Sequence, residues 1–478
     1  MNILFIAAEC TPFMKVGGLA DVVGSLPQAL KQMGNTEVRV MMPKYKKMPE
    51  VYKKKLVSIK TFNIELGSKP TVFVGVETLK VGSIRYYFID NEFYFGSRDN
   101  AYNYGDESER FAYFQKAALE SIKYLDFTPD VIHVHDWHTA MIPFLIKSKY
   151  SELSQIKSIL TIHNLAYQGI FPINDYHYFN IDYDNHFEFE GFLNFLKCGI
   201  TSVDSITTVS NTYAQEILTD YFGYGMQRLL KWRQGDLKGI INGISYKEFD
   251  PMTDPLISTP YSVEDFEIGK TANKLALYKE MDLSWDTDYP LIGIVSRLVA
   301  QKGFDLIRRV FEEMLEQDNF KFILLGDGEG EYVDYFNDLQ KQFPHKVKVY
   351  IGYNNRLAHL IYAGADMFLM PSKFEPCGLG QLIALKYGTL PIVRETGGLV
   401  DTVIPYNEFT KEGNGFSFAH FNAHDMMHVI RYALKVFYQD KGSWRQLVHA
   451  AMTSDFSWSV SAKAYKKLYQ NLLKGKRE

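Results

Sequence analysis

Glycine-rich segments that follow short apolar runs hold the residues best suited to chemistry. The first, at residues 15–19, reads KVGGL and stands between an apolar run and a segment with helical spacing. Two glycines allow a ligand to approach the backbone closely, and the start of a helix offers N–H groups to an anion. We therefore predict a phosphate site at Lys15, Gly17 and Gly18. A glycine turn with a solvated lysine is the alternative, and the absence of GxGxxG or P-loop patterns disfavours dinucleotide binding and NTP hydrolysis.

Two cations follow the apolar run at residues 291–295. Arg297 comes just after this run, and Lys302 precedes a helical segment that starts at Phe304. Two fixed positive charges at the end of a strand suit a diphosphate, because a leaving diphosphate gains charge as its bond to carbon breaks. Cations at the start of a helix oppose the helix dipole, which makes a merely structural role the weaker interpretation.

Three more glycine segments stand at predicted strand ends in the C-terminal half. Glu375 begins the sequence EPCGLG and Thr396 begins TGGL, each after a short apolar run. A carboxylate or hydroxyl beside exposed backbone amides favours ligand binding over a simple helix cap. Gly326 and Asp327 begin GDGEG, which alone indicates no more than a turn, although its position suits a nucleotide contact.

Histidines gather at two predicted strand ends in the N-terminal half. Residues 133–138 read HVHDWH, and residues 161–165 read TIHNL. His and Asp are common zinc ligands, but no further ligand cluster accompanies them, so we predict no metal site. We predict instead a hydrogen-bonded loop that carries substrate contacts, with His163 as a second polar group nearby. A core or capping histidine is the default interpretation of either segment alone.

The elements that position these residues are read from the periodicity. Short β-branched runs alternate with helical segments, which predicts parallel sheets covered by helices on both faces. The alternation lapses near residues 242–260, where we place a linker, and a hairpin-like stretch at 69–90 indicates an inserted β-ribbon. We predict an α/β fold with two Rossmann-like, doubly wound domains facing a central cleft, at residues 1–245 and 246–457. Residues 458–478 are predicted to form a helix that packs toward the N-terminal domain and a solvated tail.

Composition excludes several classes of protein. The chain has 478 residues and a net charge of −4, which disfavours a general nucleic-acid binder. The cysteines, Cys10, Cys198 and Cys377, are odd in number and widely spaced, so a reducing cytoplasm is expected. The N-terminus lacks the basic region of a signal peptide, and no apolar stretch reaches the ~18 residues of a membrane span.

Six segments taken together closely resemble bacterial glycogen synthases and plant starch synthases. They read KVGGL (15–19), HDWH (135–138), TIHN (161–164), INGI (241–244), SRL with KG (296–303) and EPCGL (375–379). The resemblance covers nearly the whole chain. It implies a GT-B fold whose second domain binds a nucleotide sugar. It also implies retaining transfer of glucose from ADP-glucose to the non-reducing end of an α-1,4-glucan such as glycogen.

The resemblance also implies a role for each matching residue. Lys15, Gly17, Gly18, Arg297 and Lys302 would contact the nucleotide diphosphate. The groups around the glucose would be Asp136, His163, Asn242, Glu375, Cys377, Gly378 and Leu379. Secondary nucleotide contacts would come from Gly326, Asp327 and Thr396. Of all these residues, Glu375, Arg297, Lys302 and His163 are predicted to be catalytic. Gly380 departs from the family, in which many members carry Thr, so a hydroxyl donor near the phosphate is absent.

Retention without an evident nucleophile suggests front-side substitution through an oxocarbenium-like state. Arg297 and Lys302 would stabilise the departing ADP, and its phosphate would accept the proton of the acceptor hydroxyl. Glu375 would then bind glucose hydroxyls, no metal or other cofactor would be needed, and closure of the cleft is expected.

Alternative functions are a UDP-glucose-dependent glucosyltransferase or a catalytically inert glucan-binding protein on the same fold. A phosphorylase would need a pyridoxal-phosphate lysine pocket and usually a longer chain. A sugar-nucleotide epimerase would not need an extended glucan-binding surface.

Overall fold

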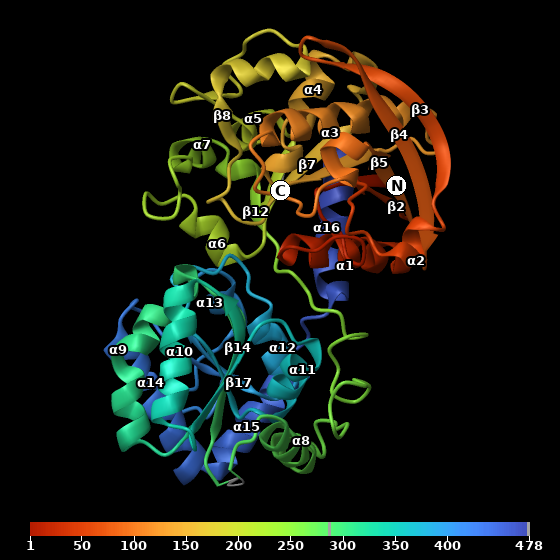
Figure 1. Ribbon diagram of the computed structural model, residues 1–478. Helices are drawn as coiled ribbons and strands as arrows, with labels where there is room; N and C mark the ends of the chain where they lie inside the picture. Colours follow the sequence, from red (N-terminus) through yellow and green to blue (C-terminus); the bar gives the residue numbers. More distant parts are fainter. Residues whose placement is uncertain (285–287, 476–478) are drawn as a thin grey trace. The chain divides into compact units, whose positions relative to one another are not determined.

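The computed structural model describes residues 1–284 and 288–475, and its contacts divide the chain into two units. Unit 1 comprises Met1–Asn242 with Trp458–Glu478, and unit 2 comprises Gly243–Ser457. Each unit is built on a sheet that is parallel over most or all of its strands, with helices packed against it (Figure 1). The predicted α/β class is confirmed. Of the tail predicted to be solvated, residues 476–478 lie outside the described residues.

Unit 1 contains a nine-stranded sheet with the order β12-β11-β7-β6-β1-β2-β5-β4-β3. The strands from β12 to β5 in this order are parallel, whereas β4 pairs antiparallel with both β5 and β3. The strands are β1 Asn2–Ile6, β2 Glu37–Pro43, β3 Val57–Leu66, β4 Lys69–Val81, β5 Ile84–Asp90, β6 Val131–His135, β7 Lys157–Ile162, β11 Ser205–Thr208 and β12 Leu237–Gly239. A small second sheet has the order β8-β10-β9, with bounds Ile170–Pro172, Phe192–Asn194 and Glu188–Phe189.

The hairpin predicted at residues 69–90 exists, but it is not a separate ribbon. Its second strand, β5, pairs in parallel with β2, so the hairpin extends the main sheet, and β3 continues the sheet beyond it. Most of β3 is exposed or half-buried, which explains why the sequence has no apolar run at this strand.

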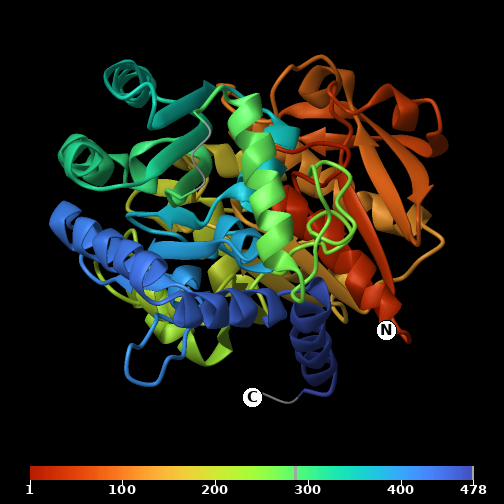
Figure 2. The same cartoon turned by 90° about the horizontal axis from the view of Figure 1, so that it is seen from below.

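Helix α1 (Gly18–Gln32) buries one apolar side that includes Leu19, Val22 and Leu26. The last helix, α16 (Trp458–Leu473), packs against α1 within the same unit (Figures 1 and 2). Lys466 of α16 donates to the carbonyl oxygens of Met33 and Gly34 at 3.1 and 3.0 Å, which satisfies acceptors at the end of α1. The other α-helices of unit 1 are α2 Glu50–Lys53, α3 Glu107–Ser121, α4 Ile142–Ser148, α5 Phe195–Ser202, α6 Asn211–Glu216 and α7 Gln227–Trp232.

Unit 2 contains a six-stranded parallel sheet with the order β15-β14-β13-β16-β17-β18. The strands are β13 Leu291–Leu298, β14 Lys321–Gly328, β15 Val347–Ile351, β16 Met367–Met370, β17 Leu390–Arg394 and β18 Phe416–Phe418. The helices are α8 Phe266–Glu280, α9 Phe304–Gln317, α10 Gly330–Gln342, α11 Asn355–Gly364, α12 Gly380–Lys386, α13 Gly398–Thr402, α14 Ala423–Gln439 and α15 Lys441–Thr453.

Alternate residues of the unit 2 sheet enter two different cores. Phe322 and Leu324 of β14 join a cluster that contains residues of α9, α10 and α14. Ile323 and Leu325 of the same strand join a cluster with residues of α8 and α11. Both faces of the sheet are therefore covered, as expected for a parallel sheet whose strands are continuously apolar.

Two strands of unit 2 are longer than predicted. Arg297 lies within β13, and Gly326 and Asp327 lie within β14, whereas the sequence placed them after these strands. The two strands pair through this extension, since Ser296 is opposite Gly326 and Arg297 is opposite Asp327. The polar residues thus lie on the last rungs of the ladder rather than in free loops.

Candidate active site

Polar residues at the carboxyl ends of β1, β6 and β7 meet at one edge of the unit 1 sheet. Asp136 follows β6, and its Oδ1 accepts a hydrogen bond from the backbone N–H of His163, after β7, at 2.7 Å. The ring of His135, the last residue of β6, bonds to the ring of His163 at 3.1 Å, Nδ1 to Nε2. The parallel order of the strands thus brings two of the predicted site residues, Asp136 and His163, into direct contact.

Asp136 has an unusual backbone conformation, with φ 53° and ψ −172°. A non-glycine residue in this region is strained, and such strain persists where the surroundings fix it, often at functional sites. Burial raises the pKa of its carboxyl to about 7, against the lowering effect of the N–H groups of His163 and Asn164. The negative charge of Glu9 raises it further.

The predicted anion loop at residues 15–19 is tied down by a carboxylate of the same unit. Glu9 is buried, and its Oε2 accepts hydrogen bonds from the N–H groups of Val16 at 2.5 Å and Gly17 at 3.0 Å. The Tyr102 hydroxyl donates to the other oxygen of Glu9 at 2.5 Å. These two amides are therefore not available to an anion, and a bound phosphate would rely on Lys15 and the first turn of α1.

The glycines of this loop have no internal reason to be glycine. A β-carbon built on Gly17 or Gly18 would meet no other heavy atom of the described residues within 4 Å, and Gly17 has φ −145°, which any residue adopts. The Lys15 ammonium lies 2.8 Å from the Asp21 carboxylate, and its side chain is 57% exposed. Open space above glycines beside an exposed cation supports close approach of a ligand at this loop.

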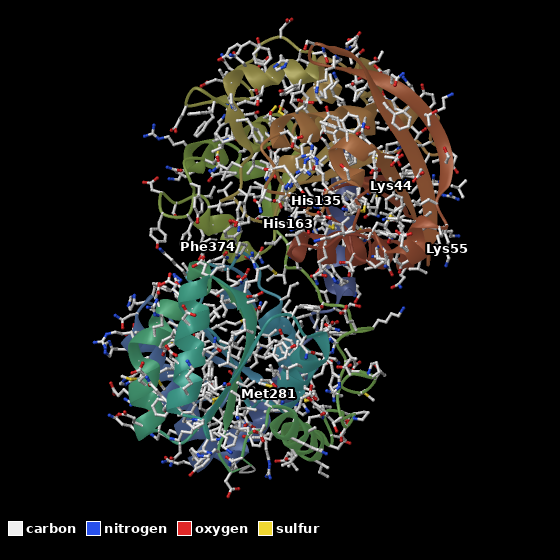
Figure 3. All side chains as sticks on the ribbon, viewed as in Figure 1. Lys44, Lys55, His135, His163, Met281 and Phe374 are labelled. Carbon is white, nitrogen blue, oxygen red and sulfur yellow. The ribbon has the colours of Figure 1, made fainter. Side chains whose placement is uncertain are left out.

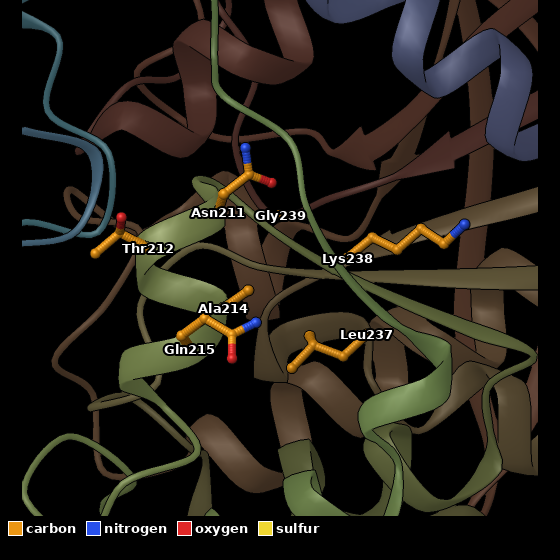
Figure 4. A pocket seen from close by; sticks show the side chains of 7 residues that line it. All are labelled: Asn211, Thr212, Ala214, Gln215, Leu237, Lys238 and Gly239. Atoms are coloured by element: carbon orange, nitrogen blue, oxygen red, sulfur yellow. The ribbon is translucent and has the colours of Figure 1, made fainter. Parts of the chain in front are cut away.

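Two hollows in unit 1 lie at this edge of the sheet. One of about 620 Å³ is lined by Lys15, Val16, Lys47 and Tyr102, among others. A second, of about 470 Å³, lies at the carboxyl ends of β11 and β12 (Figure 4). Its polar lining consists of Asn211, Thr212, Gln215 and Lys238.

Asn242 closes unit 1 after β12 and is 6% exposed. Its Oδ1 has no hydrogen-bond partner among the described residues. A buried amide oxygen without a donor is uncommon in folded proteins and calls for a ligand or water. This observation supports the predicted place of Asn242 beside a substrate.

The remaining histidines of the cluster belong to the core. His133 is fully buried and satisfies both ring nitrogens, with the Tyr469 hydroxyl at 2.8 Å and the Thr161 hydroxyl at 2.6 Å. His138 packs against Tyr102 and Trp137. Among the described residues, no group of three or more His, Cys, Asp or Glu side chains could hold a metal ion.

In unit 2, two predicted catalytic residues form an ion pair. The Lys302 ammonium lies 2.5 Å from Glu375 Oε2, with the two side chains 18% and 9% exposed. Ser372 donates to the same oxygen at 3.0 Å. The sequence assigned Lys302 to the diphosphate and Glu375 to the glucose, whereas the structure holds both charges at one point. Arg297 is exposed and makes no ion pair within the part of the chain that the structure describes.

The loops that carry Lys302 and Glu375 are fastened to each other. Lys373 donates its N–H to the Gln301 carbonyl at 2.8 Å, and the Gln301 side chain donates to the Phe374 carbonyl at 3.1 Å. Gly303 has φ 77°, and a β-carbon there would lie 1.9 Å from the Pro371 carbonyl oxygen. Only glycine permits this close approach, so the ion pair rests on a rigid frame.

The glycines around Glu375 have a structural cause that the sequence did not reveal. Gly397 has φ 47°, and a β-carbon on it would lie 2.1 Å from the Glu375 carbonyl oxygen. The buried Cys377 and Thr396 belong to the same packed segments, and Gly378 also has a positive φ of 73°. The expectation that these glycines primarily expose amides to a ligand is therefore not needed to explain them.

Three further predicted residues lie at the same end of unit 2. Gly326 packs against β13, since a β-carbon there would lie 2.1 Å from the Ser296 carbonyl oxygen. Asp327 is exposed, and Leu379 is the half-buried residue before α12. Gly380 begins α12, and a β-carbon on it would lie 3.0 Å from the Phe368 ring, so a threonine would require that ring to shift.

Sequence patterns missed Glu9, Tyr102 and Ser372. Each is a single polar residue whose role comes from contacts with residues distant in sequence or in the next turn. A carboxylate immediately after a buried strand was the one available signal, and it applied to Glu9.

Comparisons with known proteins show the class of enzyme to which this chain is similar. Residues 2–232 match the family model described as starch synthase catalytic domain, and residues 279–436 match the model described as glycosyl transferases group 1. The catalytic domain of starch synthase IV from Arabidopsis thaliana, solved bound to ADP and acarbose, matches with a TM-score of 0.91. It is 33% identical, and the match covers 99% of each chain. Fold and family models together define a glycosyltransferase of the GT-B type.

Bacterial relatives narrow the class. Glycogen synthase from Bacillus cereus is 50% identical over 485 residues, which cover 99% of this chain and 100% of the relative. Glycogen synthase from Bacillus subtilis is 47% identical and covers 100% of this chain and 99% of its own. The chain belongs to the glycogen synthase family. No helix among the described residues is long and apolar enough to cross a membrane.

Proposed function

We propose that this chain is a retaining glucosyltransferase that moves glucose from ADP-glucose to the non-reducing end of an α-1,4-glucan. The observation that carries the proposal is full-length similarity to glycogen synthases, and the ion pair between Lys302 and Glu375 in unit 2 supports it. The donor class is supported by the ADP bound to the Arabidopsis starch synthase. A reducing cytoplasm stays a prediction.

The charges of unit 2 suit a departing diphosphate. Arg297 is exposed and without an ion pair among the described residues, so it supplies an uncompensated cation. The Lys302 ammonium is held in place by the Glu375 carboxylate, and we propose that it also faces the oxygens of the departing diphosphate. As the bond from glucose C1 to the phosphate oxygen breaks, charge grows on the phosphate, and fixed cations stabilise that state more than the ground state.

The bond balance needs no protein nucleophile. The C1 to phosphate oxygen bond breaks, the C1 bond to the acceptor 4-oxygen forms on the same face, and the 4-OH proton passes to the leaving phosphate. Glu375 is already engaged with Lys302 and Ser372, which favours a binding and electrostatic role over covalent attack. We propose that no metal takes part, because Arg297 and Lys302 supply the positive charge.

The test measures incorporation of radiolabelled glucose into glycogen from ADP-glucose and from UDP-glucose, each with and without EDTA. Incorporation from ADP-glucose that ignores EDTA is the expected result. Preference for UDP-glucose would change the donor. Activity that EDTA abolishes and Mn²⁺ restores would overturn the metal-free mechanism, and no incorporation from either donor would point to an inert glucan-binding protein.

A further inference from the structure

His135 makes one ring hydrogen bond and leaves its other ring nitrogen unpaired. Its Nδ1 lies 3.1 Å from Nε2 of His163, and both side chains are labelled in Figure 3. Its Nε2 is buried and has no partner among the described residues. The side chain is fully buried, so the unpaired nitrogen does not reach bulk water.

Neighbouring groups hold the His135 ring and cannot satisfy its Nε2. The ring stacks on Phe5 at 5.4 Å and on His133 at 4.3 Å between centroids. His133 is the nearest polar ring, but both its nitrogens are already bonded, to Tyr469 and to Thr161. Within the described residues, the ring of His135 therefore makes one hydrogen bond, to His163.

Both rings of the pair are neutral at pH 7. Burial lowers the pKa of His163 to about 3 and lowers that of His135 well below its usual value. A neutral imidazole carries one proton, so one nitrogen donates and the other accepts. In the bond between the two rings, either His135 Nδ1 donates to His163 Nε2 or the reverse.

The unpaired nitrogen decides between these arrangements. If His163 donated, the proton of His135 would lie on Nε2 as a buried N–H without an acceptor. If His135 donates, its Nε2 is only a lone pair without a donor. Among backbone groups, buried N–H groups without an acceptor are rarer than unsatisfied acceptors, and we apply the same order to these ring nitrogens. The proton of His135 therefore belongs on Nδ1.

We propose that His135 is a positioning residue that fixes His163 in the tautomer with its proton on Nδ1, so that His163 offers a hydrogen-bond donor and no acceptor. The lone pair of His163 Nε2 is engaged by His135, and its Nδ1 carries the proton. No described residue makes a hydrogen bond to that Nδ1–H, and the side chain is only half-buried.

This assignment limits the part that His163 takes in the reaction. Resting on the proposed function, the Nδ1–H would donate to an oxygen of the donor, either a sugar hydroxyl or a phosphate. His163 would not take the proton of the acceptor hydroxyl, because it has no lone pair to receive it. The leaving phosphate is then the base, as the front-side mechanism requires.

The direct test reads the tautomer in the ligand-free protein by NMR of ¹⁵N-labelled histidine. Protonated and unprotonated ring nitrogens give distinct ¹⁵N shifts, and the spectrum of His163→Ala identifies the signals of this residue. The expected result is a protonated Nδ1 and an unprotonated Nε2. A proton on Nε2 of His163 in the native protein would overturn the proposal, whatever the activity of the protein.

A matched pair of variants tests the dependence on His135. In His135→Asn, the side-chain amide keeps a donor near the position of Nδ1, so the tautomer of His163 is retained. In His135→Leu, which has a similar size, the donor is lost, and His163 becomes a mixture of tautomers. His133→Asn is the control, because His133 does not bond to His163, and it leaves the tautomer unchanged. A single unchanged tautomer in folded His135→Leu would contradict the proposal.

Kinetics give an independent readout. Because part of the His163 population keeps its proton on Nδ1 in such a mixture, His135→Leu should lower kcat by about twofold to tenfold, at most the equivalent of about one hydrogen bond. His135→Asn should recover most of that loss at a similar melting temperature. If both variants lose activity equally while both stay folded, His135 acts only as core packing. The NMR result separates this failure from failure of the proposed function, since it requires no catalysis.

Discussion

The two units hold their polar residues by different means. In unit 1, carboxylates near the strand ends accept hydrogen bonds from backbone N–H groups, as Asp136 does from His163 and Glu9 does from Val16. In unit 2, backbones packed closely at glycines carry one ion pair, Lys302 with Glu375. Both units contain a segment in which a polar residue stands near two glycines. The glycines face open space in unit 1 and pack against a carbonyl oxygen in unit 2, so the same pattern has a different physical reason in each unit. Substitutions in unit 1 should primarily change chemistry, and substitutions at the glycines of unit 2 should primarily change stability.

The largest effect on activity is expected at the ion pair of Lys302 and Glu375 in unit 2. Lys302→Ala removes a cation from the departing diphosphate and should lower kcat by about 10² to 10³. Stopped assays of glucose incorporation measure this effect, and circular dichroism checks that the fold persists. Lys341→Ala, in an exposed pair with Asp338, is the control. Native turnover in a folded Lys302→Ala protein would remove this residue from the mechanism.

A pair of glycine substitutions sharpens the contrast most directly. Gly397→Ala forces a β-carbon against the Glu375 carbonyl at a positive φ and should destabilise the protein by about 2–4 kcal/mol. Gly18→Ala meets open space, so its stability should change by less than about 0.5 kcal/mol while the KM for the sugar nucleotide rises. Urea unfolding and steady-state kinetics measure both. Equal losses of stability would show that close packing requires glycine at both positions, and would contradict the contrast between the two units.

The pH dependence of stability should report Asp136. Its pKa of about 7 in the folded chain lies above the ordinary value of 3.8, so between these values the native state binds more protons than the unfolded state. Stability therefore falls as pH rises from about 4 to 7. Asp136→Asn keeps the acceptor for His163, tolerates the positive φ, and should raise stability at pH 8 by on the order of 1 kcal/mol or more. Thermal unfolding at pH 5 and pH 8 checks this, and an identical pH slope in both proteins would refute it.

The smallest effect is expected at Tyr469, which bonds to His133 on the side away from His163. Tyr469→Phe removes the partner of His133 Nδ1 and should cost about 1 kcal/mol of stability. The activity should change little, because His133 does not bond to His163. Differential scanning calorimetry and the incorporation assay measure the two quantities side by side.

The fold class was predictable because alternating apolar runs and helical segments are a direct signature of parallel sheets. Strands β3 and β18 were not predicted. The first is mostly exposed, and the second has only three residues, so neither forms an apolar run of useful length. The limits of β13 were predicted too short, because pairing with β14 continues through the polar residues Ser296 and Arg297.

The site was predictable as a set of residue types but not as a set of contacts. Glycine patterns pointed to residues 15–19 and 375–380, yet only the structure shows which glycines face open space and which face a carbonyl oxygen. The bond between His135 and His163 depends on two strands 28 residues apart lying side by side. A periodic pattern in the sequence does not give the register of two paired strands, so the contact between His135 and His163 could not be predicted from the sequence.

The position of α16 in unit 1 has a consequence for the order in which the chain is made. Unit 1 begins first, but the helix that supplies Tyr469 to His133 and Lys466 to the end of α1 is synthesised after all of unit 2. Since domains fold during synthesis as they become complete, unit 2 can finish its core on the ribosome before unit 1 does. A chain ended at residue 457 should show protease cleavage within unit 1 and a resistant unit 2. Of the two units, the one whose translation begins first is therefore the last to be completed.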